Sequence, residues 1–260
     1  MTLLPGNIHS ATLNAPIPIF APPYQTPPKT MQWSGISSII IKYRTDGNHV
    51  RDLIPSNLSV EQSPIVTIMF VDYGDSPMGP CHETIQFVEV VYNGQKYNYS
   101  MFLALDNQIA VYIGREVFGF PKVLGQVDFS PKQTDAGNVI RGSCIAHTDM
   151  SGPVVETSFT PTNRQCVHGP LHAGSEGSLV LNLRLIPSSV PGAIPSVREF
   201  VEVDFHLQGG EVWEGDWDLK FPSLAKSDSF HKLPVVERLS GQFVRNSTST
   251  VTLGDQAFGF

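Results

Sequence analysis

A β-hairpin is predicted by the sequence TIQFVEVVYNGQKYNYSMFLAL, residues 84–105. Both halves are rich in β-branched and aromatic residues, which favour extended backbone. Asn93 and Gly94 between them are typical of a two-residue hairpin turn, because both residue types adopt positive φ at low cost. We therefore expect strands at 84–92 and 96–105, followed by a second tight turn at Asp106 and Asn107.

Strand-like segments continue on both sides of this hairpin. Further strands are expected at 36–43, 64–71, 108–114, 125–129, 138–147, 179–185, 199–207, 211–219 and 235–251. A short helix is expected at 46–53, with Thr45 or Asp46 as its N-cap and Pro55 as its stop. Many short strands separated by turn residues favour a barrel or a sandwich over β-α-β units.

The N-terminal segment differs in composition from the rest of the chain. Prolines stand at positions 16, 18, 22, 23, 27 and 28. Such a segment forms neither a helix nor an inner strand, because proline lacks a backbone N–H. We expect an arm at 1–34, lying over the body or over a neighbouring subunit, or else a disordered tail. Residues 35–260 are expected to form one domain.

The overall composition is that of a globular protein. Of the 260 residues, 41% are hydrophobic and 16% are charged, and the net charge is −7. An acidic chain without a Lys/Arg-rich run argues against a nucleic-acid partner. The apolar runs are too short to span a bilayer, and no secretory leader is visible. The three widely spaced cysteines do not indicate a disulfide framework. We therefore expect a soluble, cytoplasmic protein without a membrane partner.

The sequence GREVFGFPK, residues 114–122, indicates a reactive lysine. Lys122 follows a proline within a run of glycine and apolar residues. In an apolar pocket the charged form of a lysine is disfavoured and its pKa falls. A neutral amine attacks a ketone and forms an imine, so Lys122 is a candidate nucleophile.

Eight short motifs resemble acetoacetate decarboxylase, in the order and near the spacing found in that family. They are YRTD (43–46), YNG (92–94), LDN (105–107), AVYIGRE (110–116), FPKVLG (120–125), LRLIP (183–187), WEG (213–215) and LPV (233–235). The resemblance implies a mainly β (α+β) fold: a closed, cone-like antiparallel β-barrel with a few short peripheral helices. It also implies a homo-oligomer.

The resemblance further implies that Lys122 is the Schiff-base lysine and that Glu83 is the glutamate beside it. A protonated imine withdraws electrons, so a carboxylate β to the original carbonyl leaves as CO2. This chemistry implies no metal or organic cofactor, and a keto acid as the small-molecule partner. Arg115 and Glu116 are candidate pocket residues or a structural ion pair. Three aromatic residues close to the motif are candidate pocket or core residues: Tyr73, Phe118 and Phe120.

Two further pocket positions depart from the family pattern. Val123 stands where the family has a second lysine, and Ile68 stands where it has another glutamate. An arginine of the family falls near Ile36. The loss of these polar groups favours a β-keto acid that is larger or more apolar than acetoacetate.

Three alternatives stay open at this point. The same departures are compatible with an aldolase-dehydratase that uses an enamine on Lys122. A non-catalytic barrel that holds an apolar small molecule is the alternative from another class. A metal site at Cys166, His168 and His172 is disfavoured, because Gly169 and Pro170 prevent a helix that would align the ligands.

Overall fold

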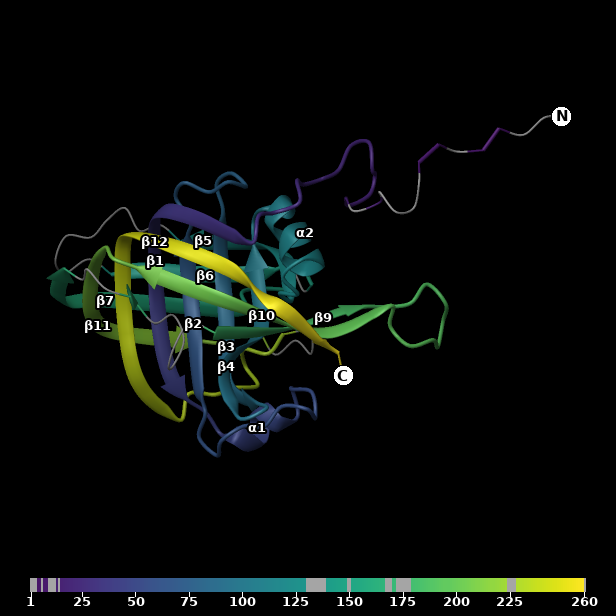
Figure 1. The fold of residues 1–260 in the computed structure, drawn as a ribbon. Coiled ribbons are helices and arrows are strands. Elements are labelled where there is room, and N and C mark those ends of the chain that lie inside the picture. Colours follow the sequence, from purple (N-terminus) through teal and green to yellow (C-terminus); the bar gives the residue numbers. More distant parts are fainter. Residues whose placement is uncertain are drawn as a thin grey trace.

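The computed structural model describes residues 15–129, 139–148, 151–166, 170–171, 179–223 and 228–259, with residues 4, 5, 7, 8 and 13 of the N-terminus. These residues form twelve strands and two helices (Figure 1). The elements are β1 (Thr30–Arg44), α1 (Gly47–Arg51), β2 (Ile65–Asp72), β3 (His82–Tyr92), β4 (Gln95–Leu105), α2 (Gln108–Glu116), β5 (Lys122–Phe129), β6 (Ile140–Ala146), β7 (Val155–Cys166), β8 (Pro170–Leu171), β9 (Leu179–Ile186), β10 (Val197–Gln208), β11 (Glu211–Lys220) and β12 (Glu237–Gly259).

The strands close into two rings that share one wall. The first ring runs β3-β2-β1-β12-β11-β7-β6-β5-β4 and is closed by pairing of β3 with β4. The second ring uses β1, β2, β3, β4 and β12 again and is completed by β9 and β10, because β4 pairs with β9 and β10 pairs with β12. In Figure 1 the shared strands lie between β7 and β11 on one side and β9 on the other. The predicted mainly β, barrel-like fold is confirmed.

The strands β1 and β2 are buried on both faces where they pair with each other, because each face lines a different ring. In β1, Ile39 and Ile41 belong to the first hydrophobic core, whereas Ile40 belongs to the second. All three side chains are at most 2% exposed. This double burial explains why Ile39–Ile41 of β1 and most of β2 are continuously apolar instead of alternating apolar and polar residues.

The prediction of a strand at 108–114 is wrong: this segment is helix α2. The Asn107 side chain accepts a hydrogen bond from Ala110 N at 3.0 Å and caps the helix, so residues 106–107 start a helix and not a hairpin. β4 and β5 run parallel, and a parallel pair needs a crossover connection, which α2 supplies. The barrel is therefore not wholly antiparallel, since β4 is parallel to both β5 and β9.

Other local predictions are closer to the structure. The short helix appears as α1, and the Asp46 side chain caps it by accepting from Asn48 N. Strand β7 lacks a counterpart among the predictions. β1 begins at Thr30, so residues 30–34 of the predicted arm lie in the sheet. Neither helix of the described residues is long and apolar enough to cross a bilayer.

The arm contacts the body of its own chain at Tyr24. Tyr24 is 8% exposed and packs into the second core. Its hydroxyl donates a hydrogen bond of 2.5 Å to Glu116 Oε2 at the end of α2.

The double burial of β1 leads to a prediction about stability. Ile39→Ala and Ile40→Ala should each lower the free energy of unfolding by about 2–5 kcal/mol, because both leave a cavity in a packed core. Chemical denaturation measures both changes, and Ile194→Ala, at an isoleucine that is 80% exposed, is the control. If only one of the two buried substitutions were costly, β1 would line a single core.

Candidate active site

Lys122 is held at the start of β5 by the end of α2. Its side chain is 11% exposed and lies directly across Gly114, where an added Cβ would stand 2.4 Å from Lys122 Cδ. Arg115 Nη1 donates a 3.0 Å hydrogen bond to the Lys122 carbonyl oxygen. Phe120 N donates to Gly114 O at 2.9 Å and folds the connecting segment back onto the helix. The glycine of the sequence motif therefore makes room for the alkyl chain of the lysine.

Glu83 on β3 faces the Lys122 amine. Its Oε1 lies 3.1 Å from Lys122 Nζ, in an ion pair without hydrogen-bond alignment. Its Oε2 accepts a 2.5 Å hydrogen bond from the Tyr73 hydroxyl. Burial, together with the Glu83 carboxylate, raises the pKa of Tyr73 well above its ordinary value, so the phenol stays protonated and remains a donor. The Glu83 carboxylate, which is 1% exposed, thus has one oxygen held and the other directed at the amine.

A cavity of about 50 Å³ adjoins this pair and is lined mainly by apolar side chains. Lys122, Glu83, Tyr73 and Cys81 are its reactive or polar members. The Phe120 ring lies 5.3 Å from Lys122 Nζ, within range of a cation–π interaction. The other lining residues are Met31, Trp33, Met78, Ile85, Phe87, Leu103, Leu105, Ala110, Ile113, Gly114, Phe118, Phe205 and Val251.

Sequence reasoning missed several of these lining residues. Cys81, Ile85 and Phe87 lie on the same face of the chain as Glu83, because side chains alternate along a strand. That alternation is the signal that would have found them. Burial, the Glu83 carboxylate and Asp106 raise the pKa of the Cys81 thiol. Cys81 is therefore a wall residue with little thiolate character.

Four of the predicted pocket residues lie outside the cavity. Ile68 is fully buried in the first core, whereas the next residue of β2, Met69, points to the opposite face and into the second core. Val123 follows Lys122 in β5 and also packs against the first core. Arg115 and Glu116 are exposed and bind other groups: Arg115 the Lys122 carbonyl, and Glu116 the Tyr24 hydroxyl. These placements correct the prediction, since neither Val123 nor Ile68 changes the polarity of the cavity.

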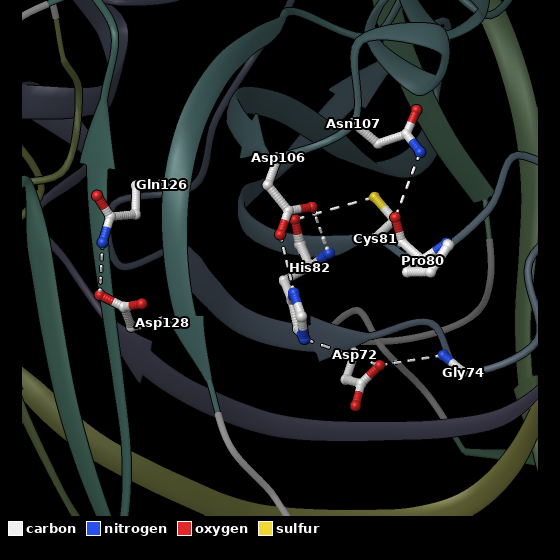
Figure 2. A network of polar contacts seen from close by, with 9 residues as sticks. All are labelled: Asp72, Gly74, Pro80, Cys81, His82, Asp106, Asn107, Gln126 and Asp128. Atoms are coloured by element: carbon white, nitrogen blue, oxygen red, sulfur yellow. Dashed lines mark hydrogen bonds and ion pairs between the residues drawn. The ribbon is translucent and has the colours of Figure 1, made fainter.

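A polar network ties the loop before β3 to the start of α2 (Figure 2). Asp106 accepts from His82 N and contacts His82 Nδ1, both at 2.8 Å. Asn107 Nδ2 donates to Met78 O at 2.8 Å and to Pro80 O at 3.3 Å. Because this loop carries Tyr73, Met78 and Cys81, the network fixes one wall of the cavity.

The disfavoured metal site cannot be placed in the fold, since His168 and His172 lie outside the described residues. Within the described ranges, no group of three or more histidine, cysteine, aspartate or glutamate side chains is arranged to hold a metal ion.

The contact of Gly114 with Lys122 leads to a prediction about geometry. Gly114→Ala should push the lysine side chain away from Glu83 and lengthen the Nζ–Oε1 distance, although alanine favours a helix more than glycine does. A crystal structure of the variant measures that distance. Gly152→Ala is the control, because an added Cβ there meets nothing within 4 Å. An unchanged Lys122–Glu83 distance in Gly114→Ala would contradict the packing described above.

Comparisons with known proteins agree with this fold. The family model "Acetoacetate decarboxylase (ADC)" matches residues 16–256. "Decarboxylase DEC1" of Cochliobolus heterostrophus is 46% identical over 93% of this chain and 94% of its own length. A solved acetoacetate decarboxylase superposes with a TM-score of 0.75 at 21% identity, covering 94% of this chain and 93% of that one. The enduracididine biosynthesis enzyme MppR, complexed with pyruvate, superposes with a TM-score of 0.67 at 19% identity, covering 90% of each chain. The chain belongs to the acetoacetate decarboxylase family.

Proposed function

We propose that this protein is a cofactor-independent lyase that decarboxylates a β-keto acid more apolar than acetoacetate, through an imine on Lys122. One observation carries the proposal: a buried lysine amine opens onto an apolar cavity with a carboxylate 3.1 Å away. The adjacent Glu83 is placed to accept the proton that the amine must lose before it attacks a ketone.

The reaction begins with attack of Lys122 Nζ on the keto carbon of the substrate. A carbon–nitrogen bond forms, and the carbonyl oxygen leaves as water after it is protonated, which gives a protonated imine. The bond to the carboxylate carbon then breaks, CO2 departs, and the electron pair moves toward the imine nitrogen to give an enamine. Protonation of the enamine carbon and hydrolysis of the imine release the ketone and return the free amine.

Glu83 is the candidate proton carrier in these steps. It accepts a proton from Lys122 before attack and returns it to the departing oxygen or to the enamine carbon. Tyr73 acts through Glu83: its hydroxyl holds Oε2, so that Oε1 stays directed at Lys122.

The apolar lining favours both the reaction and an apolar substrate. Among the described residues lining the cavity, Lys122 is the only cation, and imine formation uses it. The substrate carboxylate is therefore poorly solvated and becomes neutral CO2 as the bond breaks. An apolar substituent on the substrate is supported by the phenylalanines that line the cavity, Phe118, Phe120 and Phe205. Ile68 and Val123 do not contribute to this preference, because they lie outside the cavity.

The positions of Val123 and Ile68 also bear on the alternative reactions. Because both residues pack in the first core, they do not favour an aldolase-dehydratase. Carbon–carbon bond formation from pyruvate and an aldehyde, without CO2 release from any 3-oxo acid, would nevertheless favour it. A non-catalytic binder would form no covalent adduct.

Removal of the nucleophile tests the proposal directly. Lys122→Met should lower CO2 release from 3-oxohexanoate on the order of 10³-fold, because the electron sink cannot form. Borohydride reduction with the same substrate, followed by peptide mass spectrometry, should place the adduct of the wild-type protein on Lys122. Lys220→Met, at an exposed lysine on β11, is the control and should retain both signals. Adducts on other lysines alone would refute the mechanism.

The contact of Tyr73 with Glu83 gives a second test. Tyr73→Phe should lower kcat about tenfold with little change in KM, because it frees the Glu83 carboxylate without touching the nucleophile. Since burial raises the pKa of Tyr73, the ratio of wild-type to variant rates should stay constant up to about pH 9, where an ordinary phenol begins to ionise. Tyr99→Phe, at a buried tyrosine of the first core, is the control. A ratio that falls between neutral pH and pH ~9 would show that Tyr73 ionises in its ordinary range.

A further inference from the structure

A groove between the N-terminal arm and α2 adjoins the cavity. We infer that this groove holds the alkyl tail of the substrate, which makes the substrate a longer-chain 3-oxo acid; this inference rests on the proposed function. The groove has a volume of about 400 Å³. It is lined by residues 22–28 of the arm together with Met31, Pro77, Met78, Ile109 and Ile113.

The groove and the cavity share a wall. Met31, Met78 and Ile113 line both spaces. The cavity alone, at about 50 Å³, is too small for a keto acid with a substantial tail. Two of the three shared residues are methionines, whose unbranched side chains change rotamer easily. Movement of these side chains joins the two spaces without disturbing the sheet.

The walls of the groove are anchored on both sides. On the arm, the Tyr24 hydroxyl binds Glu116 of α2, and Leu253 N donates to Lys29 O at 2.9 Å. On the opposite side, Asn107 Nδ2 holds the Met78 carbonyl. Glu116 of the sequence motif therefore has a function outside the cavity, since it fixes the arm that forms the groove.

The lining chemistry indicates an alkyl occupant. Prolines 22, 23, 27, 28 and 77 present ring methylenes and no backbone N–H. Among the described residues, the lining of the groove contains no charged side chain, so it offers no counter-ion for a phosphate or a carboxylate. With the keto carbon at Lys122, a tail that passes the methionines enters this apolar groove.

The chain-length dependence of turnover tests the inference. For the wild-type protein, kcat/KM for CO2 release should rise from 3-oxobutanoate to 3-oxodecanoate, by at most about fourfold per buried methylene. Ile109→Trp fills the groove at a residue that lines it but not the cavity. This variant should lose about tenfold or more on 3-oxodecanoate while it retains 3-oxobutanoate turnover within about twofold.

The matched control is Ile194→Trp, at an isoleucine that is 80% exposed between β9 and β10. It should leave the ratio of the two substrates unchanged. Equal loss on both substrates in Ile109→Trp, or no change in their ratio, would overturn the groove as the tail site.

A binding measurement separates failure of the groove from failure of the proposed reaction. Calorimetric titration with acetone and 2-nonanone reports tail binding without turnover. Tighter binding of 2-nonanone that Ile109→Trp abolishes supports the groove even if no 3-oxo acid releases CO2, a result that would refute the reaction alone. Decarboxylation of both acids with 2-nonanone binding insensitive to Ile109→Trp would refute the groove alone.

Discussion

Five strands serve two hydrophobic cores at once, and the remainder of the molecule depends on this shared wall. The buried side chains of β1, β2, β3, β4 and β12 face one core or the other, so the register of these strands decides which core each of them enters. Glu83 of β3 pairs with Leu105 of β4, and Lys122 of β5 pairs with Leu103 on the other side of β4. The reactive pair therefore meets across a single strand. A one-residue slip of β3 would turn the glutamate into the first core.

The buried ion pair is maintained by groups that serve it from different parts of the chain. Gly114 gives space to the lysine, Tyr73 holds the far oxygen of the glutamate, and the network at Asp106 fixes the loop that carries Tyr73. A buried ion pair is not itself a strong source of stability, because desolvation offsets much of the attraction. The pair is better understood as a functional arrangement that the surrounding packing keeps in place.

The sequence was sufficient to predict the predominance of strands and to identify Lys122 and Glu83 as the residues of interest. It was not sufficient for α2, since β-branched residues at 108–114 resemble a strand when considered alone. The parallel pairing of β4 and β5 that requires the helix is not local information. Nor could the motif alone place Ile68 and Val123, because the facing of a side chain depends on strand register. The irregular pairing of β1 with β12, such as the register shift between Trp33 and Ile36, cannot be predicted from residue types.

The arm and the loop before β3 lie outside the shared wall, and this separation affects how the family can diversify. A substitution in β1 or β3 alters a strand that contributes side chains to both cores. A change of substrate preference through these strands would therefore also lower the stability of the fold. Residues 22–28, Pro77 and Met78 line the groove beside the cavity, yet the ring closure does not use them. These two segments can therefore change while Lys122 and the residues that support it stay constant.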